Sequence, residues 1–68
     1  MDATDLGTTL RARRKSLHLT QNETADLADI STRVLSDLEN GRATVRLDIL
    51  TAVASALGMS LSLKVSGS

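Results

Sequence analysis

The sequence predicts a small all-α domain of four to five short helices that ends in a single β-strand. The chain has 68 residues, which is the size of one domain, so we treat residues 1–68 as a unit. Up to residue 57, apolar residues recur every three or four positions, and this spacing is typical of helices that bury one face. Over residues 61–65 they alternate with polar residues instead, which is the period of a strand.

The composition excludes several classes of protein. Because the chain has no Cys, it can form neither a disulfide framework nor a thiolate zinc site, and we expect no metal and no cofactor. It has no aromatic residue, so it lacks the stacking platform that single-stranded nucleic acids use. No apolar run is long enough to cross a membrane and no secretory signal is recognisable, so we expect a cytoplasmic protein without a membrane partner.

The first helix is expected to begin near Thr4 or Asp5, since either residue can cap it. Gly7 weakens this helix but permits another helix to pack closely against it. The stripe that faces inward has spacings of four, four and three residues and consists of Leu6, Leu10, Arg14 and Leu17.

Two short helices follow, over residues 21–28 and 32–39. Thr20 and Glu23 have the spacing of a capping box, in which each side chain bonds to the backbone amide of the other residue. Ser31 is the N-cap of the next helix, so the first of the two cannot extend far past residue 28. The residues expected to face inward are Ala25, Leu27 and Ala28 on one helix and Val34, Leu35 and Leu38 on the other.

The pair Asn40-Gly41 ends the third helix, because both residues tolerate the left-handed conformation. A fourth helix is expected near residues 47–57, with Gly58 as the residue that stops it. Its inward stripe consists of Leu47, Leu50, Val53, Ala54 and Leu57.

The predicted strand at residues 61–65 carries Leu61, Leu63 and Val65 on one face. No second strand is predicted in the chain, and a strand alone leaves its backbone groups unpaired. We therefore expect it to pair with the same strand of a second copy across a two-fold axis, giving a homodimer. The alternative is a frayed C-terminal tail.

The helices at 21–28 and 32–39, with three residues between them, have the layout of a helix-turn-helix over residues 21–40. Ala25 is small enough to let the second helix cross close by, and Ile30 is placed to fill the turn. The polar residues expected to point outward from the second helix are Thr32, Arg33, Ser36 and Asp37.

Two runs carry a family resemblance: Leu-His-Leu-Thr-Gln at 17–21 and Leu-Ser-Asp-Leu-Glu-Asn-Gly at 35–41. With them the chain resembles the lambda-repressor-like, Xre-type helix-turn-helix family over about residues 6–58. The runs at 43–48 and 56–63 are most similar to the HipB-type antitoxins of bacterial toxin–antitoxin operons. The resemblance implies double-stranded operator DNA and a HipA-like kinase toxin as partners. It also implies a C-terminal strand that pairs between protomers.

The resemblance also implies roles for individual residues. The N-terminal part of the recognition helix and its outer face would contact bases, through Ser31, Thr32, Arg33, Ser36 and Asp37. Phosphate contacts would come from Gln21, Asn22, Asn40, Arg42 and Arg46. Arg14 and Glu39 would form a structural salt bridge between the first helix and the end of the recognition helix.

Two of these roles have alternatives in the sequence. Arg33 can bind guanine O6 and N7 bidentately, or it can form a surface salt bridge with Asp29 or Asp37. The basic run at residues 11–15 is either a solvated helix end or a contact with the DNA backbone.

The chain departs from the family at three positions. His18 and Asp29 stand where the family often has Gly, but both residue types tolerate positive φ, so we expect the turns to form. Thr24 stands where the family usually has an apolar residue. These departures predict lower stability but the same fold.

We interpret the chain as a sequence-specific DNA-binding repressor in the bacterial cytoplasm, associated with the nucleoid. It would be the antitoxin of a HipBA-like operon, acting in autoregulation and toxin neutralisation. One alternative is a stand-alone small Xre-type regulator. Another, favoured by the formal net charge of +0, is an interaction module that keeps the fold without binding DNA. An enzyme is not expected, because the chain has no catalytic residue set and is too small for a pocket of usual size.

Overall fold

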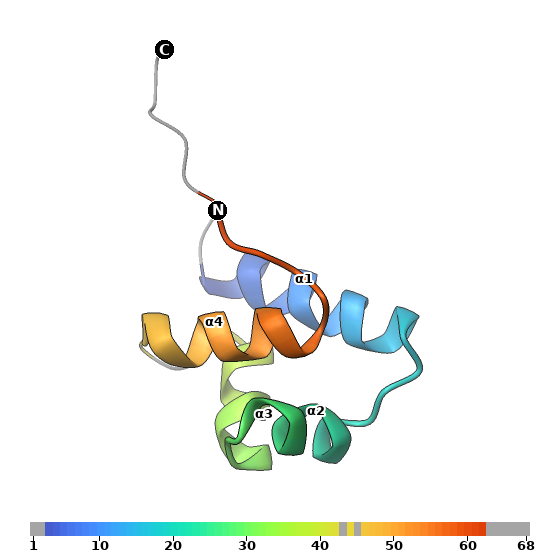
Figure 1. The fold of residues 1–68 in the computed structure, drawn as a ribbon. Helices are drawn as coiled ribbons and strands as arrows, with labels where there is room; N and C mark the ends of the chain where they lie inside the picture. Colours follow the sequence, from blue (N-terminus) through green and yellow to red (C-terminus); the bar gives the residue numbers. More distant parts are fainter. Residues whose placement is uncertain (1–2, 43, 45, 63–68) are drawn as a thin grey trace.

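The computed structural model describes residues 3–42, 44 and 46–62 and forms four α-helices there (Figure 1). They are α1 (Ala3–Ser16), α2 (Gln21–Ala28), α3 (Thr32–Glu39) and α4 (Leu47–Ala56). The all-α prediction is confirmed. Within the described residues no strand occurs, and Leu61 has no regular secondary structure. Leu63 and Val65 lie outside the described residues, so the paired strand stays a prediction.

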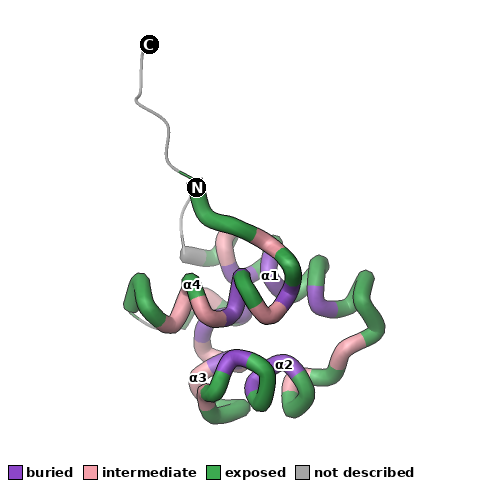
Figure 2. Tube along the Cα trace, in the orientation of Figure 1, coloured by how far each residue is buried: buried purple, intermediate pink, exposed green. Residues whose placement is uncertain are grey.

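The helices form two layers (Figure 1). α1 packs on α3, whereas α2 packs on both α3 and α4. Figure 2 shows that the buried residues lie on the sides of the helices that face one another. The hydrophobic cluster between them is aliphatic and consists of Leu10, Ala25, Ala28, Leu35, Leu38, Val53 and Leu57.

The predicted ends of α2, α3 and α4 agree with the structure to within one residue, but α1 begins at Ala3 and includes Thr4 and Asp5, which were expected to cap it. Thr20 and Glu23 form both hydrogen bonds of the capping box, each at 3.0 Å. The hydroxyl of Ser31 accepts from the Val34 amide at 3.1 Å and caps α3. His18 and Asp29 adopt φ values of 58° and 57°, so the two turns form with residues other than glycine.

Gly7 brings α1 against the end of α3. A Cβ at this position would lie against the carbonyl oxygens of Leu38 and Glu39, at only 2.5 Å from the latter. Because the neighbouring atoms are backbone, they cannot move aside cheaply. Gly7 therefore sets the distance between α1 and the helix-turn-helix.

Three leucines that were expected to face inward are exposed instead. Leu17, Leu27 and Leu47 have exposed fractions of 38%, 63% and 71%. On α2 the inward side is filled by residues 24, 25 and 28, and at 3.6 residues per turn Leu27 falls well outside that arc. Leu47 is the first residue of α4 and is not among the hydrophobic residues that pack against the core.

Candidate nucleic-acid interface

The turn between α2 and α3 brings the two helices into a compact helix-turn-helix. The left-handed backbone of Asp29 ends α2, and the Ile30 amide then donates to the carbonyl of Ala25 at 3.0 Å. Ala25 is only 1% exposed, and Ile30 is half-buried against the core, as predicted for both residues. These contacts fix the direction in which α3 leaves the turn.

A buried ion pair holds the end of α3 against α1. Arg14 binds Glu39 bidentately, with Nε to Oε2 at 2.7 Å and Nη2 to Oε1 at 3.0 Å. The third guanidinium nitrogen donates to the carbonyl of Leu19 at 2.8 Å. The hydrogen bond to Glu39 raises the pKa of Arg14 above its ordinary value, so the cation is permanent.

Gln21 completes this cluster from α2. Its Nε2 donates to Glu39 Oε1 at 3.2 Å. The first residue of α2 is thus tied to the last residue of α3, in addition to the contact through α1. The resemblance implies only a phosphate contact for Gln21, and no spacing along the chain indicates this second contact with Glu39. An Nε2 has two hydrogens, so one stays available for a ligand.

On the outer face of α3, Thr32 and Arg33 are exposed, whereas Ser36 and Asp37 are half-buried. Among the residues that the structure describes, Arg33 makes no ion pair, either with Asp29 or with Asp37. Its guanidinium is therefore available to a ligand. The surface salt bridge that the sequence left open for Arg33 is not formed.

Two neighbouring hydroxyls at the start of α3 have different partners. Ser31 Oγ accepts from the Val34 amide, as described above. Thr32 Oγ1 donates to Asn22 Oδ1 on α2 at 2.7 Å. Asn22 and Thr32 were both predicted to be site residues, but the sequence did not indicate that they bind each other.

The residues after α3 are partly engaged within the chain. Asn40 Nδ2 donates to the carbonyl of Ser36 at 2.9 Å. Arg46 bridges to Asp48 at 2.9 Å, but both side chains are well exposed, so this pair holds Arg46 only weakly. The side chain of Arg42 is exposed and forms no ion pair with the described residues.

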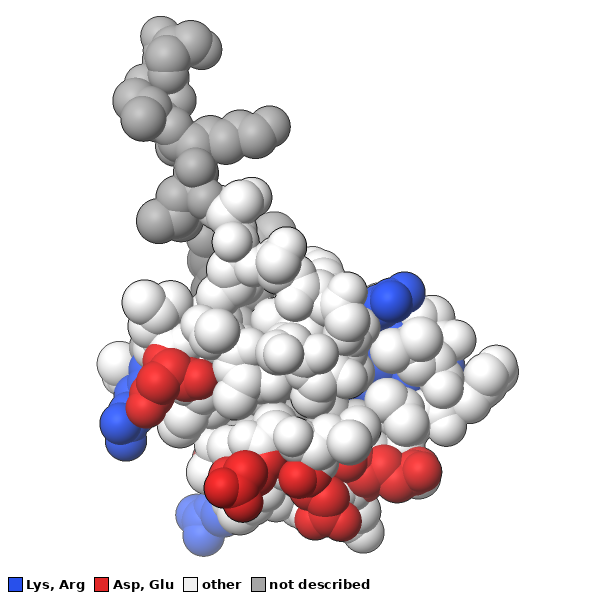
Figure 3. Space-filling model, in the orientation of Figure 1, with Lys and Arg blue, Asp and Glu red and all other residues white. Residues whose placement is uncertain are grey.

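Charge is unevenly distributed although the formal net charge is +0. Figure 3 shows acidic side chains gathered over α2, and the residues 21–31 contain three carboxylates but no Lys or Arg. The exposed cations Arg33 and Arg42 lie on α3 and directly after it. In the basic run, Arg13 Nε donates to the carbonyl of Leu57 at 2.9 Å and so caps α4. Arg11 and Lys15 are exposed.

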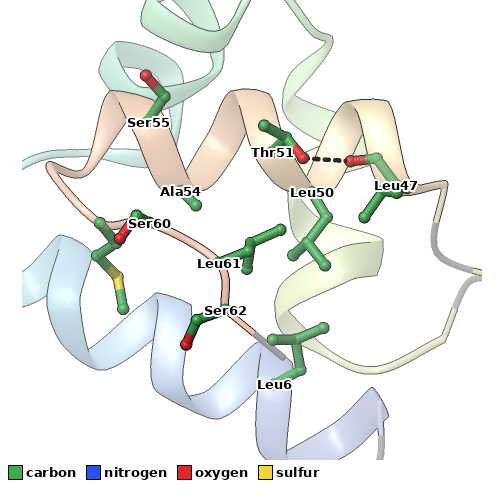
Figure 4. Close-up of a pocket in the computed structure, with 10 residues that line it drawn as sticks. Leu6, Leu47, Leu50, Thr51, Ala54, Ser55, Ser60, Leu61 and Ser62 are labelled. Atoms are coloured by element: carbon green, nitrogen blue, oxygen red, sulfur yellow. Dashed lines mark hydrogen bonds between the residues drawn. The ribbon is translucent and has the colours of Figure 1, made fainter. Parts of the chain in front are cut away.

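An apolar groove of about 860 Å³ lies beside α4, and we had not expected a pocket of this size. Figure 4 shows Leu6, Leu50 and Leu61 converging on it from α1, α4 and the segment after α4. Leu47 and Leu61 at its edge are 71% and 42% exposed.

In the part of the chain that the structure describes, no group of His, Asp and Glu side chains could hold a metal ion. No described helix is long and apolar enough to cross a membrane.

The buried hydroxyl of Thr24 was not foreseen. Thr24 is completely buried on the inner face of α2. Its Oγ1 has no hydrogen-bond partner among the described residues. The sequence marked position 24 as a departure from the family, and that departure is the signal from which an unsatisfied group could have been predicted.

Comparisons with known proteins agree with this geometry. The family model "HTH_3: Helix-turn-helix" matches residues 10–64. An HTH-type transcriptional regulator, y4mF of Sinorhizobium fredii, is 33% identical over 93% of this chain and 83% of its own length. The immunity repressor protein of Bacillus phage phi105 is 40% identical over 84% of this chain. The chain spans only 40% of that repressor's length.

Solved structures show the same fold. Two crystal structures of the clp gene regulator ClgR from Corynebacterium glutamicum superimpose with TM-scores of 0.80 and 0.82, at 38% and 37% sequence identity. They match 85% and 87% of this chain and 62% and 76% of the ClgR chains. The relatives are regulators and not enzymes. From its sequence match and its fold, the chain belongs to the lambda-repressor-like (Xre-type) helix-turn-helix family.

Proposed function

We propose that this protein is a sequence-specific repressor that binds double-stranded DNA with α3 in the major groove. The observation that carries the proposal is the outer face of α3, where Thr32 and Arg33 are exposed and Arg33 has no ion pair among the described residues. The buried Arg14–Glu39 pair joins the last residue of this helix to α1. The relatives of this protein, a phage immunity repressor and an HTH-type transcriptional regulator, support the same function.

In this proposal the roles of the predicted site residues are divided between bases and phosphates. Arg33 binds a guanine through O6 and N7, and its neighbours Ser31, Thr32, Ser36 and Asp37 read adjacent bases. Phosphates are held by Gln21 and Asn22 at the positive N-terminal end of α2. On the other side of α3 they are held by Asn40, Arg42 and Arg46.

The test is a gel-shift titration of Arg33→Ala against operator and random duplexes. We expect a loss of about 1–3 kcal/mol on the operator only, because a base contact carries sequence information. Arg42→Ala is the matched control, since loss of a phosphate contact weakens binding to every duplex and lowers the salt slope by about 1. Unchanged operator preference in Arg33→Ala would contradict the base contact.

A homodimer is part of the proposal. The apolar groove and the exposed Leu47 and Leu61 at its edge support an interface on this side of the molecule. A chain of zero net charge has weak non-specific affinity for DNA, so two copies on half-sites about 10 bp apart are needed for tight binding.

Deleting residues 61–68 tests where that interface lies. We expect a monomer in sedimentation and weaker operator binding, because the predicted strand is removed, including Leu61 at the edge of the groove. A truncated protein that remains dimeric would instead assign the interface to α4. Circular dichroism serves as the control that the helical part is still folded.

We further propose an antitoxin role in a HipBA-like operon, with autoregulation and association with the nucleoid. The run at residues 56–63, with its similarity to HipB-type antitoxins, supports it. Co-expression with a HipA-like kinase from the neighbouring gene should give a stable complex and restore growth. If no gene for such a kinase is adjacent to the gene of this protein, the stand-alone regulator is the better interpretation.

The zero net charge also favours a second candidate, an interaction module that keeps the fold without binding DNA. The two functions differ in their response to salt. A repressor should bind duplex DNA at low salt with an affinity that falls steeply as salt rises. An interaction module should show no affinity for duplex DNA even at low salt.

A further inference from the structure

The hydrogen bond between Thr32 and Asn22 determines what the Thr32 hydroxyl can offer to DNA. Thr32 Oγ1 donates to Asn22 Oδ1 at 2.7 Å. A hydroxyl has a single hydrogen and two acceptor lone pairs. Because that hydrogen is directed at Asn22, Thr32 Oγ1 has only acceptor capacity left.

Ser31 shows that this restriction is particular to Thr32. Its Oγ already accepts from the Val34 amide at 3.1 Å, and no described acceptor takes its hydrogen. Ser31 can therefore still donate to a ligand. The two hydroxyls at the start of α3 thus have opposite hydrogen-bonding capacities, although their side chains are chemically alike.

We propose that Thr32 selects a base that carries an exocyclic amine, and that Asn22 sets this selectivity. In the major groove, adenine presents N6 and cytosine presents N4 as donors, whereas guanine O6 and thymine O4 are acceptors. An acceptor-only hydroxyl binds the first two and is repelled by the other two. The inference rests on the proposed binding of α3 in the major groove.

Asn22 acts here as a positioning residue and not as a base contact. Its Oδ1 is occupied by Thr32, whereas both hydrogens of its Nδ2 stay available for the adjacent phosphate. The Asn22 side chain would then bind a DNA phosphate through Nδ2 and, through Oδ1, keep the Thr32 hydroxyl as an acceptor. Loss of Asn22 should change base preference as well as affinity.

The test begins with selection of binding sites from a random duplex library by the wild-type protein and three variants. Thr32→Val keeps the shape of the side chain but removes the hydroxyl, so preference should be lost at one base position. Asn22→Ala frees the Thr32 hydrogen, so thymine and guanine should become tolerated at that position. Asn22→Asp still accepts from Thr32, so the amine preference should remain while affinity falls, because a carboxylate repels phosphate.

Base analogues then test directly whether the exocyclic amine is recognised, and they distinguish adenine N6 from cytosine N4. If adenine is selected, it is replaced by purine, and if cytosine is selected, it is replaced by 2-pyrimidinone, since each analogue lacks only the exocyclic amine. Wild-type affinity should fall about three- to tenfold, the effect of one hydrogen bond, whereas the affinity of Thr32→Val should not change. Thermal melting of each variant verifies that it is folded.

Each result is decisive. Selection of thymine or guanine at the position that depends on Thr32 would overturn the inference, and so would unaltered preference in Asn22→Ala. Neither result would affect the proposed repressor function, because sequence-specific binding would still be present. If the folded wild-type protein enriches no sequence at all, the proposed function fails, and the inference fails with it.

Discussion

The helix-turn-helix contains two buried polar regions, the Glu39 side of the Arg14–Glu39 pair and the hydroxyl of Thr24. The two regions differ in how many hydrogen-bond partners they have. Both members of the ion pair have further hydrogen-bond partners, since Arg14 also donates to the carbonyl of Leu19 and Glu39 also accepts from Gln21. Thr24 is more deeply buried, but its hydroxyl has no partner among the described residues. Two polar groups in the same small core therefore differ in their effect on stability.

The difference shows that burial alone does not determine what a polar group contributes. A buried charge is tolerated where other charges and dipoles replace the water it has lost. An isolated hydroxyl in an aliphatic core has lost water and gained nothing. We therefore expect opposite changes in the free energy of unfolding when one partner is removed from the ion pair and when the hydroxyl of Thr24 is removed.

The largest effect is expected from Glu39→Ala. It leaves the Arg14 cation buried without its counter-charge, so the free energy of unfolding should fall by about 3–5 kcal/mol in urea denaturation. The double variant Arg14→Met with Glu39→Leu removes both charges and keeps the volume, so it should be close to the wild type or more stable. Equal destabilisation in the double variant would mean that the pair stabilises through its attraction and not only by avoiding an unpaired charge.

Thr24→Val should have the opposite sign. Valine has nearly the same shape and no hydroxyl, so removal of the unsatisfied group should raise the free energy of unfolding by about 1–2 kcal/mol. Thr24→Ser is the matched control, because it keeps the hydroxyl and deletes the methyl group, and it should be destabilising. A destabilised Thr24→Val would show that the hydroxyl is satisfied and would remove the contrast between the two regions.

The sequence predicted the local features of this molecule better than the contacts between helices. Capping residues, helical spacing and turn residues are local, and they gave α2 and α3 with the bounds found in the structure. The exposure of Leu27 and the partners of Gln21 depend on how short helices are packed, and no spacing along the chain encodes that. The Arg14–Glu39 assignment came from family resemblance, since residues 25 positions apart have no local signal.

The smallest effect concerns Glu23, an exposed carboxylate that contrasts with both buried regions. Its hydrogen bonds with the Thr20 backbone and side chain lower its pKa below the ordinary value. A carboxylate with a lowered pKa binds fewer protons in the folded than in the unfolded chain near that pKa. Its contribution to stability is therefore present above the unfolded pKa of 4.5 and is lost as pH falls through the folded pKa.

The comparison of wild type with Glu23→Gln across this acidic range isolates that contribution. Gln can form the same capping box but does not titrate, so the stability difference between the two proteins should change as pH falls below 4.5 and be constant at neutral pH. Thr20→Ala breaks the capping box itself and should destabilise the protein by about 1 kcal/mol at neutral pH. A pH-independent difference between wild type and Glu23→Gln would mean that the charge of this exposed carboxylate contributes nothing to stability.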